Sequence, residues 1–309
     1  MKIAILSRKR DIYSTRRLVQ AVTAHGHEAV VLDPLKCKIL IESGVHQVYF
    51  RGEPVHDVDA VLPRIGASVT EYGLAVVRQF ELMGVPLVND SNSISQSRDK
   101  LRCLQLMAEA DISIPKTFLC RSPRHVKKAI ELVGGIPVIL KLQQGTQGVG
   151  VILADSYQSA ESTLDTLWSL GQNILIQEYI GESAGSDVRV LVIGGRIVAA
   201  MKRVAQAGDF RANIHRGATG MQVRLTAEQE RVALRAVKIL GLSIAGVDLL
   251  EGKERPILME VNSSPGFQGL EKATGLDIAG EIVRYVVSLG EPRGAHFHAD
   301  DIALTDRRV

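Results

Sequence analysis

The chain has 309 residues, of which 46% are hydrophobic and 23% charged, and its formal net charge is +3. The composition is that of a soluble globular protein, the length predicts two or three domains, and so mild a charge gives no reason to expect direct nucleic-acid binding. No apolar run reaches the roughly 18 residues of a membrane helix. Met1 leads directly into a strand-like run, and the cysteines lack metal-ligand spacing, so we expect a cytoplasmic protein with reduced thiols and no membrane contact.

Residues 1–95 are predicted to form a parallel βαβ domain, because short apolar runs alternate with segments of helical periodicity. The expected strands are 3–6, 29–32, 60–62 and 85–88, and the expected helices are 16–24 and 74–83. The basic loop 7–17 and Arg64 follow two of these strands at the carboxyl edge of the sheet, where such sheets bind ligands. They are candidate contacts for the acidic tail of a substrate, and an ordinary solvated basic surface is the alternative.

Residues 96–184 are predicted to form a second domain. One helix is expected over 91–110, followed by strand 116–120, helix 122–133, strand 137–142, helix 160–170 and strand 174–180. Lys100, beside Leu101 on the first helix, is either a surface lysine or a phosphate ligand, and Lys141 ends a strand. In the last strand Gln177, Glu178 and Tyr179 interrupt an apolar run, which would allow its end to hold the edge of an adenine ring.

The segment 143–150, QQGTQGVG, joins two expected strands. Its glycines allow backbone N–H groups to approach an anion closely, and Thr146 adds a hydroxyl group. It lacks the patterns of the Walker loop and of the dinucleotide-binding turn. Two interpretations remain open, a flexible lid over phosphates and a plain hairpin.

Residues 185–290 are predicted to form a third domain. Strands 187–193 and 197–202 flank Gly194-Gly195, and helix 227–240 begins with the capping box of Thr226 and Gln229. A final helix is expected over 277–289, and residues 291–309 are expected to be a mobile tail. His296 and His298 in that tail fit an exposed pair better than a metal site.

Two strands near the end of this third domain, 244–250 and 257–262, carry polar side chains in otherwise apolar runs. Pairing them as a hairpin would bring Asp248 beside Glu260 and Asn262, and the last two share one face of their strand. Two carboxylates and an amide carbonyl suit a hard cation such as Mg²⁺ or Mn²⁺. The alternative is an ordinary hairpin with polar ends.

Taken together, the motifs resemble those of the ATP-grasp ligases and, more narrowly, of the RimK family. The segments that carry the resemblance are PRIG (63–66), RDKL (98–101), QQGTQGVGV (143–151), IQEYI (176–180), GDFRANIHRG (208–217), IAGVDLL (244–250) and MEVNSSPGFQGLEKATGLDIAG (259–280). The resemblance extends to about residue 288. It implies an α/β fold of the ATP-grasp type, in which two α+β subdomains clasp ATP between antiparallel sheets.

The resemblance also implies a set of site residues. ATP would be bound by Lys100, Lys141, Gly145, Thr146, Gln147, Gly148, Glu178, Tyr179, Asp187, Arg211, Ala212 and Asn213, with Asp187 on the ribose side. Asp248, Glu260 and Asn262 would hold two Mg²⁺ or Mn²⁺ ions. As catalytic residues we assign Arg203 and Arg211, which would stabilise the phosphoryl oxygens and the tetrahedral oxyanion.

The activity that the resemblance implies is addition of glutamate to the C-terminus of ribosomal protein S-six through an acyl phosphate, with poly-glutamate as a further product. A homo-oligomer, such as a tetramer, is also implied. Three alternatives remain: a related ligase that joins an amino acid to a carrier protein, a dipeptide or glutathione-type ligase that accepts a free small molecule, and a catalytically silent nucleotide-binding regulator.

Overall fold

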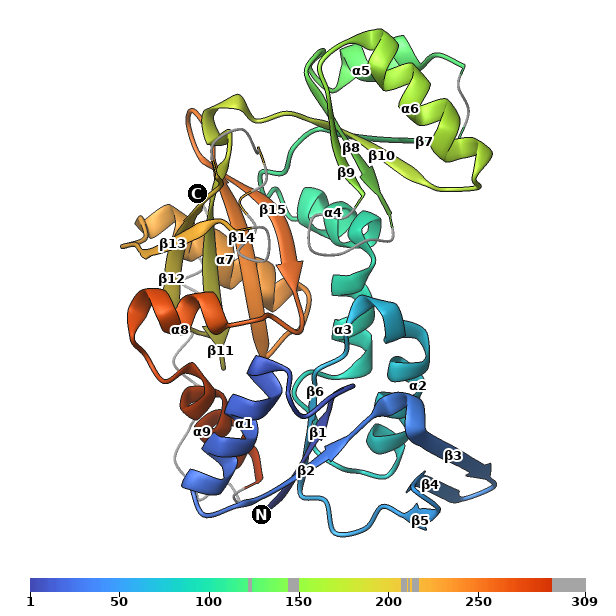
Figure 1. Ribbon diagram of the computed structural model, residues 1–309, viewed down its shortest axis with the longest axis vertical. Helices are drawn as coiled ribbons and strands as arrows, with labels where there is room; N and C mark the ends of the chain where they lie inside the picture. Colours follow the sequence, from blue (N-terminus) through green and yellow to red (C-terminus); the bar gives the residue numbers. More distant parts are fainter. Residues whose placement is uncertain (122–123, 144–149, 207–209, 211, 213–216, 291–309) are drawn as a thin grey trace, which may run out of the picture.

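The computed structural model describes residues 1–121, 124–143, 150–206, 210, 212 and 217–290. The predicted lid residues Gly145 to Gly148, the predicted ligands Arg211 and Asn213, and the tail with His296 and His298 lie outside the described residues. Figure 1 shows three regions, each built around its own main sheet: an N-terminal parallel sheet, a central sheet covered by two helices, and a long C-terminal sheet.

The N-terminal region contains the predicted parallel sheet. Strands β1 (Lys2–Leu6), β2 (Glu28–Leu32) and β6 (Ala60–Pro63) pair in the order β2-β1-β6, with helices α1 (Tyr13–Ala24) and α2 (Thr70–Leu82) packed beside them. The prediction of a fourth strand over 85–88 is wrong, because this segment makes only a single parallel bridge, between Val61 and Leu87. The next bond of that ladder would need a backbone N–H from Pro63, which proline lacks.

A small antiparallel sheet of β3 (Cys37–Glu42), β4 (Val45–Phe50) and β5 (Glu53–Pro54) was not predicted. It lies between the short 3₁₀ helix η1 (Pro34–Lys36) and β6, and Val48 anchors it in the hydrophobic core beneath α2. Another 3₁₀ turn, η2 (Ala67–Val69), leads into α2.

The predicted long helix over 91–110 is in fact two helices, α3 (Ser91–Arg98) and α4 (Lys100–Glu109). The break lies at Asp99, whose φ of −80° and ψ of 98° are not helical. The Asp99 carboxylate accepts a hydrogen bond from the backbone N–H of Arg102 at 3.0 Å and so caps the second helix. As a result, Arg98 ends one helix and Lys100 begins the next.

The central region is a four-stranded antiparallel sheet in the order β7-β10-β8-β9. Its elements are β7 (Thr117–Cys120), α5 (Val126–Leu132), β8 (Val138–Leu142), β9 (Val151–Ala154), α6 (Tyr157–Ser169) and β10 (Ile174–Glu178). Apolar residues of α5 and α6 pack on one face of the sheet and leave the other face to the cavity described below. Helix α5 begins later than the predicted residue 122.

The C-terminal region is a five-stranded antiparallel sheet in the order β13-β12-β11-β14-β15. After the 3₁₀ turn η3 (Gly181–Ser183), it comprises β11 (Ser186–Ile193), β12 (Arg196–Val204), β13 (Thr219–Gln222), α7 (Ala227–Ile239), β14 (Ile244–Glu251) and β15 (Pro256–Asn262), followed by α8 (Gln268–Thr274) and α9 (Ile278–Gly290). Gly194 and Gly195 form the predicted turn with φ of +56° and +73°, conformations that favour glycine in two-residue hairpins. The predicted capping box of Thr226 and Gln229 is confirmed.

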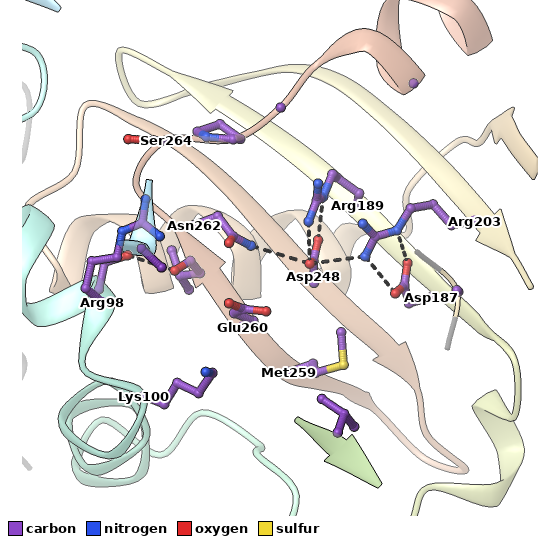
Figure 2. Close-up of a pocket in the computed structure, with 18 of the residues that line it drawn as sticks. Arg98, Lys100, Asp187, Arg189, Arg203, Asp248, Met259, Glu260, Asn262 and Ser264 are labelled. Carbon is purple, nitrogen blue, oxygen red and sulfur yellow. Dashed lines mark hydrogen bonds and ion pairs between the residues drawn. The ribbon is translucent and has the colours of Figure 1, made fainter. Parts of the chain in front are cut away.

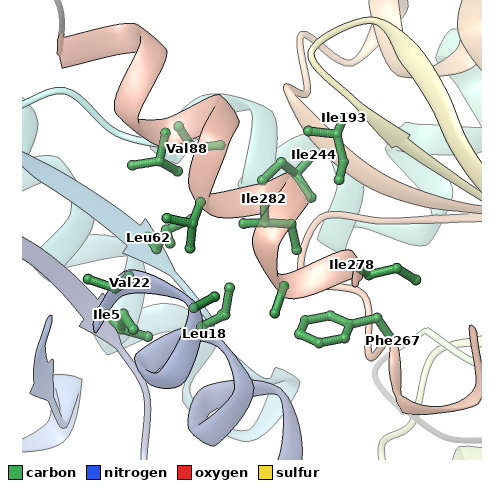
Figure 3. Close-up of a cluster of buried hydrophobic side chains, with 14 of the residues drawn as sticks. Ile5, Leu18, Val22, Leu62, Val88, Ile193, Ile244, Phe267, Ile278 and Ile282 are labelled. Carbon is green, nitrogen blue, oxygen red and sulfur yellow. The ribbon is translucent and has the colours of Figure 1, made fainter. Parts of the chain in front are cut away.

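Helix α9 joins the N-terminal and C-terminal regions through one hydrophobic core. Its Ile278, Ile282 and Val286 pack with Ile5 of β1 and Ile193 of β11 in a single buried cluster (Figure 3). The predicted fold class is therefore confirmed, with a parallel N-terminal sheet followed by antiparallel sheets. No helix in the described part of the chain is both long and apolar enough to cross a membrane.

Candidate functional site

A cavity of about 1120 Å³ lies where the three regions meet. Its walls come from the carboxyl edge of the N-terminal sheet, the junction of α3 and α4, the open face of the central sheet, and the strands β11, β12, β14 and β15. The predicted site residues that line it are Lys100, Lys141, Glu178, Tyr179, Asp187, Arg203, Ala212, Asp248, Glu260 and Asn262. The fold therefore brings together every predicted site residue that lies in the described part of the chain.

The hairpin of β14 and β15 places the predicted metal ligands side by side. Asp248 pairs directly with Glu260 across the two strands, and Asn262 follows on the same face of β15. The Nδ2 atom of Asn262 lies 3.5 Å from Oδ2 of Asp248, while Glu260 lies on the cavity side of β15 (Figure 2). The predicted pairing of the two strands is confirmed.

Asp248 lies in a buried cluster of alternating charges. Arg189 binds it with two hydrogen bonds, from Nε at 2.7 Å and from Nη2 at 2.6 Å, and Arg203 Nη2 lies 3.1 Å from Oδ2 (Figure 2). Arg203 also donates two hydrogen bonds to Asp187, at 2.5 and 2.7 Å. The register of β11, β12 and β14 sets this arrangement, because Arg189 lies opposite Asp248 and Asp187 lies opposite Arg203.

The charges of this cluster balance. Burial opposes ionisation of Asp248, but the two guanidinium groups outweigh it and lower the pKa of Asp248. In Asp187 burial dominates and raises the pKa to about 6, against the attraction of Arg203. Both oxygens of Asp187, which we predicted on the ribose side of ATP, accept hydrogen bonds from Arg203. Its carboxylate therefore holds the predicted catalytic arginine in place.

Two lysines enter the cavity from separate elements. Lys100, at the start of α4, donates to the carbonyl oxygens of Leu142 and Gln143 at 3.4 and 3.3 Å. Lys141 extends from β8, and burial lowers its pKa to about 8, with Glu260 acting in the opposite direction. Burial also lowers the pKa of Lys100, and Glu260 again acts against the shift. Glu260 thus faces both lysines as an opposing charge.

The end of β10 forms another part of the wall. Glu178 and Tyr179 line the cavity where this strand leaves the central sheet. The Glu178 carboxylate accepts a hydrogen bond from the backbone N–H of Lys116 at 3.0 Å, which fixes the carboxylate beside β7. Ala212, the remaining predicted ligand in the described part of the chain, is buried and also lines the cavity.

Sequence reasoning missed two arginines at the site. Arg98 was placed inside a continuous helix, and its position at the end of α3 became visible only with the break at Asp99. Arg189 stood in an alternating strand without a visible partner, and only the register opposite Asp248 identifies its role. In the basic loop, Arg8 pairs with Asp33 at 3.0 Å and Arg17 binds Glu271 and Asp277, while Arg8 and Lys9 also line the cavity. The contact of this loop with an acidic substrate stays a prediction.

The donor set on the hairpin fits a hard divalent cation. Glu260 and Asn262 supply a carboxylate and an amide oxygen on one face, which is the chemistry that Mg²⁺ prefers. A carboxylate has about four lone-pair positions, and the three N–H contacts from Arg189 and Arg203 leave Asp248 able to donate to a cation. The described residues hold no cluster of three or more His, Cys, Asp or Glu side chains suited to a metal. The hairpin offers two carboxylates and one amide side chain.

The comparisons with known proteins agree with this architecture. Residues 1–94 match the RimK PreATP-grasp domain, and residues 97–286 match the RimK-like ATP-grasp domain. A protein of Pseudoalteromonas translucida named probable alpha-L-glutamate ligase is 50% identical over 294 residues, which cover 95% of this chain and 98% of that protein. A protein of Chromohalobacter salexigens with the same name is 52% identical over 286 residues, or 93% of this chain and 95% of that protein.

Among solved structures, the crystal structure of the RimK domain protein ATP-grasp from Sphaerobacter thermophilus is similar to this one. Its TM-score is 0.73 at 25% sequence identity, and the match covers 93% of this chain and 100% of that chain. The fold and the family models define an ATP-dependent ligase of the ATP-grasp class. Within that class, the chain belongs to the RimK family.

Proposed function

We propose that this protein is a glutamate ligase that uses ATP and Mg²⁺ to join glutamate to the C-terminal carboxylate of a protein. The observation that carries the proposal is the convergence of Lys100, Lys141 and the Asp248, Glu260 and Asn262 hairpin in one cavity. The relatives named probable alpha-L-glutamate ligase, which are about half identical, support glutamate as the amino acid. The acceptor that we propose is the C-terminus of ribosomal protein S-six.

The reaction that fits this site has two steps. An oxygen of the acceptor carboxylate attacks the γ-phosphorus of ATP, and the bond to the ADP oxygen breaks to give an acyl phosphate and ADP. The α-amine of glutamate then attacks the acyl carbon, phosphate leaves, and the amine loses its proton as the peptide bond forms. A bound Mg²⁺ would neutralise phosphate charge during the first step.

The residues of this chain have separate tasks in the proposal. Lys100 and Lys141 bind the phosphates, Glu178 and Tyr179 frame the adenine, and Glu260, Asn262 and Asp248 hold the cation, with two ions as the proposed number. Arg203 stabilises the tetrahedral oxyanion from a position fixed by Asp187. The proposed ligands Gly145, Thr146, Gln147, Gly148, Arg211 and Asn213 lie outside the described residues.

Intact-mass spectrometry tests the activity directly. Ribosomal protein S-six incubated with this protein, ATP, Mg²⁺ and glutamate is expected to gain mass in steps of one glutamyl unit at its C-terminus. A sample without ATP, and one with glutamine in place of glutamate, serve as controls. ADP release without a mass step on S-six would assign the ligase to another acceptor, such as a carrier protein, and no ADP release with any acceptor would contradict the proposal.

The lowered pKa of Lys141 gives a further prediction. In the protein without ATP, Lys141 loses its proton near pH 8. Because the charged form binds the phosphates, the dissociation constant of ATP is expected to rise about tenfold for each pH unit above that value. Isothermal titration calorimetry between pH 7 and pH 10 measures it. The control is Lys141→Arg, whose guanidinium stays charged over this range and should flatten the dependence. An unchanged pH dependence in that variant would show that Lys141 is not the titrating group.

A further inference from the structure

One wall of the cavity carries positive charge beyond what the phosphate and metal ligands explain. The cluster of Arg189, Arg203, Asp187 and Asp248 is balanced within itself. Arg64 and Arg98 line the cavity outside that cluster. In the described part of the chain neither of them forms an ion pair, and the negative charge of Glu260 acts on Arg98.

The two arginines are held by backbone carbonyl groups. Arg64 follows β6, and its Nη2 atom donates to the carbonyl oxygen of Pro265 at 2.6 Å. Arg98 donates through Nη2 to the carbonyl oxygen of Ile65, one residue beyond Arg64. The Nε atom of each is shut off from solvent and has no hydrogen-bond partner among the described residues. Each guanidinium is therefore fixed in place by a neutral carbonyl group, and no ion pair in the described part of the chain neutralises its charge.

This arrangement is costly in the absence of an anion. Burial and, to a smaller extent, the charge of Arg98 together lower the pKa of Arg64 to about 10. Burial also lowers the pKa of Arg98, against the attraction of Glu260. Both groups nevertheless remain protonated at neutral pH, so two like charges face one cavity. A buried charge is stable only when it is paired, and a bound anion would provide the pairing.

The position of the pair indicates which part of the substrates it meets. Strand β15 carries Met259, Glu260 and Asn262 in that order, and in Figure 2 Arg98 lies beyond the Asn262 end of this row. The side chain of Arg64 packs against the loop that follows β15, because its guanidinium lies 5.8 Å from the ring centre of Phe267. An anion bound there lies beyond the proposed metal ligands, at the end of the row away from Met259.

We propose that Arg64 and Arg98 form a subsite that binds a carboxylate of the amino-acid substrate. The proposal rests on the function proposed above and deepens it, because it assigns the residues that select an acidic amino acid. Two guanidinium groups can bind one carboxylate through paired hydrogen bonds, which provides both charge and directional recognition. The phosphates of ATP and the cation then have their own ligands in Lys100, Lys141 and the hairpin.

Steady-state kinetics of Arg64→Gln and Arg98→Gln test this subsite. The KM for glutamate is expected to rise about ten- to a hundredfold, because each variant loses a charged hydrogen-bonding partner. The KM for ATP is expected to stay within about threefold of the wild-type value, since the nucleotide ligands are unchanged. Arg64→Lys and Arg98→Lys keep the positive charge but lose the planar guanidinium that can form two parallel hydrogen bonds. They should therefore recover part of the affinity for glutamate. They also replace the Gln variants if those fail to fold. Arg78→Gln, at an exposed position of α2, is the matched control.

Substrate analogues identify the carboxylate. If the pair binds the side-chain carboxylate, the preference for glutamate over glutamine should decrease in both Gln variants. If it binds the α-carboxylate, the preference for glutamate over its α-amide should decrease instead. A rise in the KM for the protein acceptor with no change in the KM for glutamate would overturn the proposal.

A binding measurement keeps the subsite testable even if the protein does not ligate glutamate. Thermal unfolding with ADP and Mg²⁺ present is followed while glutamate, aspartate or glutarate is added. A carboxylate that raises the melting temperature of the wild type but not of Arg64→Gln supports the subsite. This result would hold even if the wild type ligated no glutamate and the proposed function were therefore wrong. Equal shifts in both proteins, or no shift in either, would overturn the subsite regardless of activity.

Discussion

Glu260→Gln is expected to reduce ATP-dependent ADP release by about a thousandfold or more, with the fold intact. The substitution keeps the size of the side chain and removes the negative charge at the point where β15 faces the cavity. A metal ion contributes several kcal/mol of charge stabilisation in phosphoryl transfer, and each 1.4 kcal/mol corresponds to a factor of ten. The variant also removes the charge that opposes deprotonation of Lys100 and Lys141. A coupled assay for ADP, with circular dichroism to confirm folding, measures the effect.

The matched control for this variant is Glu254→Gln. Glu254 is exposed in the turn of the same hairpin and makes none of the cavity wall, so its substitution tests the effect of losing one acid from this element. We expect wild-type activity from it. A well-folded Glu260→Gln protein that releases ADP at the wild-type rate would remove Glu260 from the set of cation ligands.

Arg203→Met is expected to destabilise the C-terminal sheet by about 3–5 kcal/mol. The side chain of Arg203 is 5% exposed, and its removal leaves the Asp187 carboxylate buried without a guanidinium. Breaking a buried ion pair by removing one partner has an effect of this size. Asp248 keeps Arg189 as a partner, so the effect should be concentrated at Asp187. Hydrogen exchange of the amides in β11 and β12 measures the local free energy of opening.

The double variant Asp187→Leu/Arg203→Met tests whether the unpaired Asp187 carboxylate causes this loss of stability. It removes both charges and fills the space with apolar groups, so most of the lost stability should return. Arg196→Met, at the exposed start of the same strand β12, is the matched control. If the double variant were as unstable as Arg203→Met, the loss would come from packing of the arginine side chain and not from the unpaired carboxylate.

The sequence was most informative where one local pattern determined the structure. The alternation in β15 placed Glu260 and Asn262 on one face, and a single register of the hairpin with β14 brought Asp248 beside them. The capping box of α7 and the glycine turn between β11 and β12 were also local signals, and both were confirmed. Each of these predictions depended on residues within one hairpin or one helix turn.

The features that the sequence did not reveal depended on contacts between distant segments. The pairing of Arg203 with Asp187 and Asp248 follows from the register of three strands, which no one strand reveals. The break at Asp99 was hidden because aspartate can either lie inside a helix or cap one, and the choice depends on tertiary packing. For Arg64, the sequence indicated the correct edge of the sheet, but only the fold showed that its charge lies inside the cavity wall.

The hydrophobic core around α9 contains residues from both sides of the boundary between the two family domains. The family models divide the sequence between residues 94 and 97. However, the last described helix fills the space between the first strand and the C-terminal sheet, so both ends of the described chain share one interior (Figure 3). The division therefore separates two family domains that share one hydrophobic core. A change in the size or shape of an apolar side chain on β1 would need a compensating change on α9, about 270 residues later in the chain.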